Sequence, residues 1–348
     1  MLFSRNTMIA RTFHTTLLFT VTAALLASVS SSICATTSAK AEKLTLVSNR
    51  WPPFTDSFEA TRIALDIVHL ALLRIGIEAE TQIIDQWATL QSDLKAGIYD
   101  GSGTIWNSPE RSKYLHFSDP YLENRLILIG KKGLDVSAQS LDALKGKRLG
   151  LVKGYAYGDL LESAEGVHIH HGPNDMENIK SVWLGQCDYA LVDSLVVHHL
   201  VSEHGIEAED YFAIGLKPVL IQPLHFALRI EHPHAISILE NFNREIRIMQ
   251  ADGSYHRILR LSWIRTDIDA DGRTELVQGG SAIGPNAPLN AYDISYTQHM
   301  FNAIEERERY WIDGHYYDDW NQVRAAYPDA YENAPSDNEG FLLFKRQF

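Results

Sequence analysis

Residues 97–121, GIYDGSGTIWNSPERSKYLHFSDPY, bring together a glycine-rich segment, a helix start and the approach to an apolar strand. The glycines in the first half disfavour a regular helix and leave backbone N–H groups free, so this segment is predicted to wrap a small polar ligand. Ser108 is a good helix N-cap, and Pro109 stands where a missing N–H costs nothing. The stretch therefore predicts a helix that presents Arg111 from its first turn.

Arg111 is the first candidate for ligand binding in this stretch. Its guanidinium is always charged and offers a rigid fork of N–H donors, which suits the two oxygens of a carboxylate. The sequence FSDPY, residues 117–121, then ends the predicted helix and leads into the apolar strand 126–130. We therefore predict a carboxylate site close to a buried strand.

The glycine-to-aspartate turn, the SPER helix start and the FSDPY exit occur here in one order. This order resembles the amino-acid-binding family of periplasmic solute-binding proteins that serve ABC importers, family 3. The resemblance implies an α/β fold with two doubly wound lobes joined by a two-crossing hinge, similar to type II periplasmic binding proteins. It also implies that Arg111 binds the α-carboxylate of the ligand.

The remaining chain contains the alternating units that such a fold needs. Residues 43–49 and 77–84 read as strands and residues 61–75 as the helix between them, which predicts a right-handed parallel unit. Residues 182–193 repeat the order of helix end, glycine and buried strand that residues 94–100 begin. This near-duplication predicts two similar lobes.

The predicted organisation has four parts. Residues 1–41 form a signal peptide, and residues 132–220 form lobe 2. Residues 43–131 and 221–264 together form lobe 1, so the chain crosses between the lobes twice. The resemblance ends with lobe 1, and residues 265–348 form a C-terminal extension.

Two oppositely charged residues define the predicted ligand clamp. Asp193 ends an apolar strand, where an isolated carboxylate is costly unless a cation meets it. In the resembled family the matching aspartate binds the α-ammonium group, so Arg111 and Asp193 would hold a zwitterion between the lobes. In the resembled family the matching turn donates hydrogen bonds to the same carboxylate, so the resemblance implies that Tyr155 and Ala156 bind it through their backbone N–H groups.

Aromatic residues are expected to form the walls of this site. The resemblance places Trp51 over one side of the ligand and Trp87 at the second wall, although tryptophans are also common core fillers. Trp106 falls where the family has a small hydroxyl residue, and it is expected to narrow the pocket. Thr104 is the best candidate for a remaining hydroxyl contact. The identity of the ligand side chain stays open.

Charge and the N-terminal residues indicate where the protein acts. The chain of 348 residues has a formal net charge of −13, which disfavours binding to nucleic acid or anionic membranes. Residues 1–41 combine a basic start, an apolar stretch and a small-x-small end at residues 39–41, which is typical of a cleaved secretory signal. We therefore expect a periplasmic protein, and a monomer. After cleavage only Cys187 remains, so no internal disulfide is expected.

The extension begins with an acidic loop, residues 267–275. It has carboxylates at its first, third, fifth and ninth positions and glycine at the sixth: Asp267, Asp269, Asp271, Glu275 and Gly272. This spacing curls oxygens around a hard cation, and the loop resembles the nine-residue calcium loops of FG-GAP-type repeats. A structural Ca²⁺ is therefore predicted, and the alternative is an acidic turn that caps the next segment of the chain. Residues 292–311, beyond a linker, are predicted to form a helix.

The predicted function is binding without covalent chemistry or a required cofactor. The protein would close on an amino acid or a related small carboxylate and present it to an ABC permease. One alternative is an enzyme resembling the dehydratases of this family, which would need a further Asp or Glu in the cleft that meets no ligand cation. Another is a sensory or interaction role, in which the extension binds a partner.

Overall fold

The computed structural model describes residues 42–328 except 59, 162–163, 205–207, 216, 260–262, 270, 280–282, 285, 289–291 and 294–308. The predicted signal peptide, residues 1–41, lies outside the described residues. The same holds for most of the predicted helix at 292–311.

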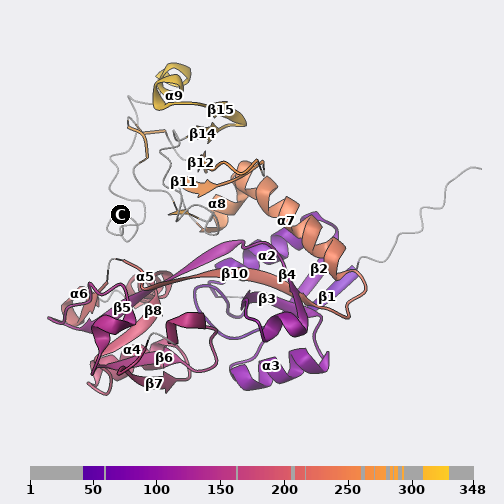
Figure 1. Ribbon diagram of the computed structural model, residues 1–348. Coiled ribbons are helices and arrows are strands. Elements are labelled where there is room, and N and C mark those ends of the chain that lie inside the picture. Colours follow the sequence, from indigo (N-terminus) through magenta and orange to yellow (C-terminus); the bar gives the residue numbers. More distant parts are fainter. Residues whose placement is uncertain are drawn as a thin grey trace, which may run out of the picture. The chain divides into compact units, whose positions relative to one another are not determined.

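A ten-stranded sheet organises the first two thirds of the chain (Figure 1). Its order is β2-β1-β3-β10-β5-β8-β6-β7, with β4 also paired to β10 and β9 to β5. The strands are β1 Glu42–Ser48, β2 Ile77–Ile83, β3 Gly101–Trp106, β4 Leu115–Phe117, β5 Leu122–Lys131, β6 Arg148–Val152, β7 His168–Gly172, β8 Tyr189–Asp193, β9 Phe212–Ile214 and β10 Leu220–Arg229.

Helices and short 3₁₀ turns connect these strands, and two further helices, α7 and α8, follow the last of them, β10 (Figure 1). They are α2 Ile63–Arg74, α3 Trp87–Ala96, α4 Asp175–Trp183, α5 Ser194–His204, α6 Ala208–Tyr211, α7 Ala235–Ala251, α8 Ser254–Leu259, η1 Arg111–Lys113, η2 Leu141–Leu144 and η3 Gly158–Leu161. Helix α2 connects the parallel strands β1 and β2 and buries six apolar side chains. It ends before Gly76, which takes the left-handed φ of 81° that favours glycine.

Two long strands, β5 and β10, join the halves of the sheet. Strand β10 pairs antiparallel with β3 over Leu224–Leu228 and with β5 over Leu220–Leu224, while β5 pairs with β8 over Leu126–Gly130. On either side the strands are parallel, β2-β1-β3 in one half and β8-β6-β7 in the other. This topology confirms the predicted α/β class with two doubly wound parts and two crossings.

The glycine-rich segment differs from its prediction. Residues Gly101–Trp106 form the fully buried strand β3, paired with β10, and do not form an open segment around a ligand. A Cβ atom at Gly101 would lie 2.0 Å from the backbone oxygen of Ala227. The glycine here therefore allows close packing of two strands, which is a different use of the residue from freeing its backbone for a ligand.

The predicted start of a helix at Ser108 is a single 3₁₀ turn. The backbone N–H of Arg111 donates to the Ser108 Oγ at 3.3 Å, so the serine caps the turn as expected. Strand β4 begins directly after it at Leu115 and leaves no room for a longer helix. Arg111 nevertheless lies in the first turn, as the motif predicts.

A second sheet forms most of the described C-terminal extension, in the order β13-β11-β12-β14-β15. Its elements are β11 Trp263–Thr266, β12 Glu275–Gln278, β13 Tyr292–Asp293, β14 Arg309–Ile312, β15 His315–Tyr317 and the helix α9 Trp320–Ala326. It has its own apolar cluster, which contains Leu276, Tyr310, Ile312 and Val323. This small sheet is hydrogen-bonded to helix α7, because the Trp311 Nε1–H donates to the Ala251 oxygen at 3.2 Å.

The prediction of a helix over residues 292–311 is wrong at both described ends. Tyr292–Asp293 and Arg309–Ile312 are strands, and the residues between them lie outside the described part. Burial along β14 alternates: Tyr310 and Ile312 are buried, while Arg309 and Trp311 are partly exposed. A period of two indicates a strand. The sequence prediction favoured a helix instead, because Tyr292 and Tyr296, earlier in the same stretch, have helical spacing.

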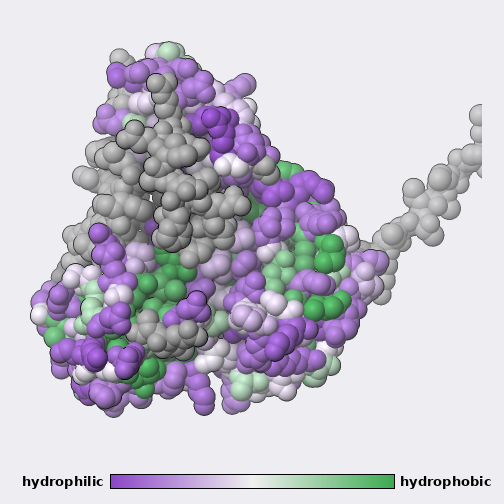
Figure 2. Space-filling model, viewed as in Figure 1, coloured by the Kyte–Doolittle hydropathy of each residue, from purple (hydrophilic) through white to green (hydrophobic). Residues whose placement is uncertain are grey.

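None of the described helices is long and apolar enough to cross a bilayer. The face in Figure 2 is mainly hydrophilic, with hydrophobic side chains in separate groups. Cys187 is buried and free.

Candidate functional site

A pocket lies where β1, β3 and the turn after β6 meet, and its space, including the open mouth, is about 260 Å³. The lining residues are Asn49, Trp51, Trp87, Thr104, Ile105, Trp106, Arg111, Tyr155 and Leu224. Five of the predicted ligand residues are therefore brought together, namely Trp51, Trp87, Thr104, Arg111 and Tyr155. Asp193 and Ala156 are outside this lining.

Arg111 is the charged residue of the pocket, and only 3% of it is exposed. Its Nη1 donates to the Trp106 oxygen at 2.6 Å, its Nη2 donates to the Gly154 oxygen at 3.2 Å, and the guanidinium lies 4.9 Å from the Trp87 ring centroid. The neighbouring Glu110 pairs with Lys95, and in the described part of the chain no ion pair joins Arg111 to a carboxylate. Burial lowers the pKa of Arg111, but the group stays charged. Its charge is therefore largely desolvated and unmatched.

Asp193 ends β8 and is 1% exposed. Its Oδ1 accepts a hydrogen bond from the Leu195 N–H at 2.7 Å, while its Oδ2 has no hydrogen-bond partner among the described residues. Burial raises the pKa of Asp193 to about 7, and the neighbouring Asn124 amide opposes this shift. The Asn124 Oδ1 in turn accepts the indole N–H of Trp106 at 2.7 Å. Trp106 and Asn124 thus connect the pocket with Asp193.

Aromatic rings pack against one another in the pocket. The centroid of Tyr155 lies 5.1 Å from Trp106, 5.5 Å from Trp51 and 5.9 Å from Trp87, all in edge-to-face arrangements. Tyr157 extends this group behind Trp106 at 5.8 Å. Trp106 therefore occupies space that a small hydroxyl residue would leave open, in agreement with the expected narrowing.

Three other residues predicted to contact the ligand form hydrogen bonds within the protein. The backbone N–H of Tyr155 donates to the Val152 oxygen at 3.4 Å within its turn, and the ring faces the pocket. The oxygen of Ala156 accepts from the Gln222 Nε2 at 2.9 Å. The Thr104 hydroxyl forms a hydrogen bond with the Ser48 hydroxyl. Direct ligand contacts by these residues stay predictions.

Asp175, the first residue of α4, is a buried carboxylate that the sequence analysis missed. It is 4% exposed, and its Oδ2 accepts the Trp51 indole N–H at 2.7 Å. Burial raises its pKa to about 7. In sequence it resembles any acidic residue in the first turn of a helix, so only its partner, 124 positions away, distinguishes it. It lies outside the pocket lining, behind the lining residue Trp51.

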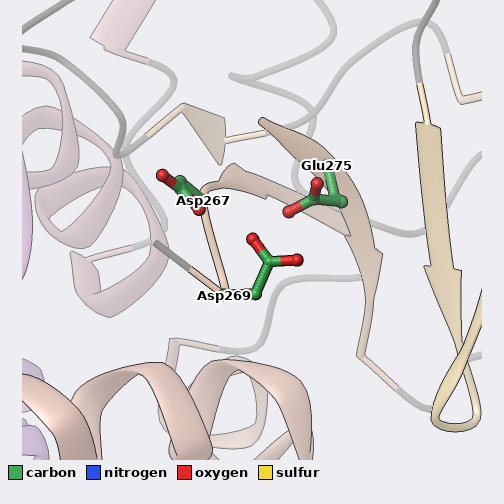
Figure 3. A group of neighbouring side chains, drawn as sticks. All are labelled: Asp267, Asp269 and Glu275. Atoms are coloured by element: carbon green, nitrogen blue, oxygen red, sulfur yellow. The ribbon is translucent and has the colours of Figure 1, made fainter. Parts of the chain in front are cut away.

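The acidic loop brings three predicted metal ligands together between β11 and β12 (Figure 3). Oxygen atoms of Asp267, Asp269 and Glu275 lie within 4.8 Å of one another. Arg309 enters the same group: its Nε donates to the Glu275 Oε1 at 3.1 Å, and its Nη2 lies 3.5 Å from Asp269 and 3.6 Å from Asp271. The carboxylate spacing fits a hard cation, and the Arg309 guanidinium already offsets part of the negative charge. Calcium binding stays a prediction.

The family profile of bacterial extracellular solute-binding proteins, family 3, matches residues 45–265. The chain belongs to this family. The match ends within one or two residues of the predicted limits 43 and 264, and the C-terminal sheet lies almost wholly beyond it.

Two curated relatives of this family 3 protein are named as amino-acid-binding proteins. The L-cystine-binding protein TcyJ of Escherichia coli is 26% identical over 223 residues, which is 63% of this chain and 80% of the relative. The ABC transporter arginine-binding protein 1 of Escherichia coli is 29% identical over 235 residues, covering 63% and 89% of the two chains. An ancestral arginine-binding protein bound to arginine has the same fold, with a TM-score of 0.53, 24% identity, and coverage of 63% of this chain and 96% of that one.

Proposed function

We propose that this family 3 protein is an extracytoplasmic solute-binding protein that closes on an amino acid or a related small carboxylate and delivers it to an ABC permease. The observation that supports this best is Arg111, a buried guanidinium that lines the pocket and has no carboxylate partner among the described residues. The family and its amino-acid-binding relatives support the same class of ligand. We infer a periplasmic location from the family and from the predicted signal.

Burial explains why Arg111 requires an anion. Removing a charged group from water costs several kcal/mol, and a well-placed opposite charge offsets this cost. A guanidinium has five N–H donors, and two are engaged with the Trp106 and Gly154 oxygens. Donors therefore remain for a ligand carboxylate, which would form charge-assisted hydrogen bonds there.

Closure of the predicted lobes around the ligand would use contacts that cross between them. Trp51 of predicted lobe 1 donates to Asp175 of predicted lobe 2, and the Asn49 Nδ2 donates to the Tyr155 hydroxyl at 3.2 Å. Arg111 reaches the Gly154 oxygen in the same direction. A hinge at β5 and β10 would let these contacts form and separate.

A thermal-shift screen tests the proposal. Protein expressed from the full sequence is tested with amino acids and small carboxylates, together with Arg111→Ala and the exposed control Arg244→Ala. A ligand that binds only the folded state raises the melting temperature by mass action. We expect a shift in the wild type and in Arg244→Ala that Arg111→Ala loses. A full shift in Arg111→Ala would refute the role of this residue.

A sensory role is a second candidate, because the C-terminal extension is hydrogen-bonded to helices α7 and α8. Besides Trp311, the His256 Nε2 lies 3.1 Å from the Val277 oxygen, and the Thr266 hydroxyl donates to the Gln250 Oε1 at 3.1 Å. Helices α7 and α8 would thus transmit closure to the small sheet. If they do, ligand should change the rate at which a protease cleaves the extension. An unchanged rate at saturating ligand would argue against this role.

A further inference from the structure

The charge of the pocket lining points to the ligand class. Among the described residues that line it, Arg111 is the sole charged side chain, and the others are aromatic, aliphatic or neutral polar groups. The indole N–H of Trp87, a lining residue, is buried and has no acceptor among the described residues. The described pocket thus combines a positive charge with a spare donor, and it offers no carboxylate to a ligand cation.

Trp106 lies between the pocket and Asp193, the carboxylate predicted to bind a ligand ammonium group, and the other buried carboxylate beside the lining, Asp175, already accepts the Trp51 N–H. The Trp106 ring packs against Tyr155 and Tyr157, and its N–H is held by Asn124, which lies beside Asp193. An α-ammonium group next to a carboxylate bound at Arg111 would therefore meet this indole ring and a guanidinium of like charge. Binding the ammonium would remove its hydration without supplying an ion pair.

We propose that the pocket takes a small carboxylate that carries no α-ammonium group, with a flat or apolar body packed among Trp51, Trp87 and Tyr155. This inference rests on the proposed function and narrows its ligand class. Arg111 binds the carboxylate, the aromatic rings contact the body, and Trp106 excludes the ammonium group. Trp106 is the residue that determines this specificity.

Matched pairs of ligands test the inference by calorimetric titration of protein expressed from the full sequence. The probes are L-phenylalanine with 3-phenylpropanoate and L-leucine with 4-methylpentanoate, in which hydrogen replaces the ammonium group. We expect the deaminated member to bind at least about tenfold more tightly in each pair. Tighter binding of the amino acids would overturn the inference and leave the proposed function standing. No binding by any of the four would overturn the inference and count against the carboxylate site itself.

Variants at Trp106 test the cause of the preference. Trp106→Ser removes the indole and opens the way to Asp193, so we expect the preference to move toward the amino acids by about tenfold or more. Trp106→Phe keeps a ring in place, so we expect a smaller movement than in Trp106→Ser, and the exposed Arg244→Ala serves as the control that retains the wild-type preference. Adding Asp193→Asn to Trp106→Ser should cancel the gain. Circular dichroism verifies that each variant is folded, and an unchanged preference in folded Trp106→Ser would overturn the role of Trp106.

Discussion

At the scale of single residues, Arg111 combines deep burial with an unmatched charge. Its position depends on the Ser108 cap and on the carbonyl groups of Trp106 and Gly154. These contacts orient the guanidinium but do not neutralise it. Buried charged groups that lack an opposite charge occur at binding sites, where the ligand supplies the missing partner.

Replacing Arg111 should separate the effect of its charge from that of its shape. Arg111→Lys keeps the charge but loses the planar fork, and we expect affinity for a carboxylate ligand to fall about tenfold. Arg111→Met also removes the charge, and a loss of about 2 kcal/mol or more, roughly 30-fold, is expected. Titration calorimetry measures both, with Arg244→Ala as control. Equal affinity of Arg111→Met and wild type would contradict the assignment.

The buried carboxyls Asp175 and Asp193 should make stability depend on pH in an unusual direction. Their pKa values are raised to about 7 in the folded protein, against about 3.9 for an unfolded aspartate. Between these values the folded state binds more protons, so the free energy of unfolding falls as pH rises from about 4 to about 7. The full effect is at most about 4 kcal/mol for each group.

The variant Asp175→Asn tests this dependence, because asparagine still accepts the Trp51 N–H. We expect denaturant titrations from pH 4 to pH 8 to show a smaller decline for this variant than for the wild type. Asp188 is a useful contrast, because its hydrogen bond with Arg148 lowers its pKa and its stabilisation is lost as pH falls. That loss lies below about pH 4, so Asp188→Asn should lower the free energy of unfolding without changing the slope between pH 4 and pH 8. Identical profiles for Asp175→Asn and wild type would exclude a titrating Asp175.

At the scale of the elements, the close contact of β3 with β10 is the feature most sensitive to substitution. A Cβ at Gly101 meets a backbone oxygen at 2.0 Å, whereas one at Gly103 meets a terminal methyl group of Leu65 at 3.0 Å. We expect Gly101→Ala to lower the free energy of unfolding by about 3 kcal/mol and Gly103→Ala by less, because a side chain can move and a paired strand cannot. Urea denaturation measures both, and equal losses would contradict this explanation.

The loop between β11 and β12 gives a prediction about calcium. Arg309 and a divalent cation would compete for Asp269 and Glu275. We expect calcium to raise the melting temperature of the wild type slightly and that of Arg309→Met more. At a calcium concentration one hundred times the dissociation constant, binding raises the free energy of unfolding by about 2.7 kcal/mol. Asp267→Asn should weaken the effect in both. The same melting temperature in calcium and in chelator for the wild type and Arg309→Met would show that the loop is an acidic turn.

At the scale of the whole molecule, β5 and β10 carry the chain between the predicted lobes, and side-chain contacts hold the two together around the pocket. Asn49 and Trp51 supply two of these contacts, to Tyr155 and Asp175. The combined variant Asn49→Ala with Trp51→Phe should therefore separate the lobes without unfolding them. Small-angle scattering should show a larger radius of gyration at an unchanged circular dichroism spectrum. An unchanged radius would mean that other contacts determine closure.

Much of the fold was predictable because its signals are local. Three such signals each depend only on residues close by in the chain: the alternating apolar residues before Asn49, the glycine after α2 and the Ser108 cap. The prediction was wrong where two periodicities competed, as in the aromatic run that became β14. It was also wrong where glycines served packing between strands, as at Gly101, because the partner strand is distant in sequence.

The family, the α/β class and the position of Arg111 were readable from the chain alone, because motif order, capping and hydrophobic period depend on neighbouring residues. Which side chains meet was decided by tertiary packing. It placed Asp175 against Trp51, put Trp106 between the pocket and Asp193, and brought Arg309 into the acidic loop. The physical reason is that burial and charge pairing depend on packing between segments far apart in the chain, and these two effects set the pKa values of buried groups such as Asp175 and Asp193.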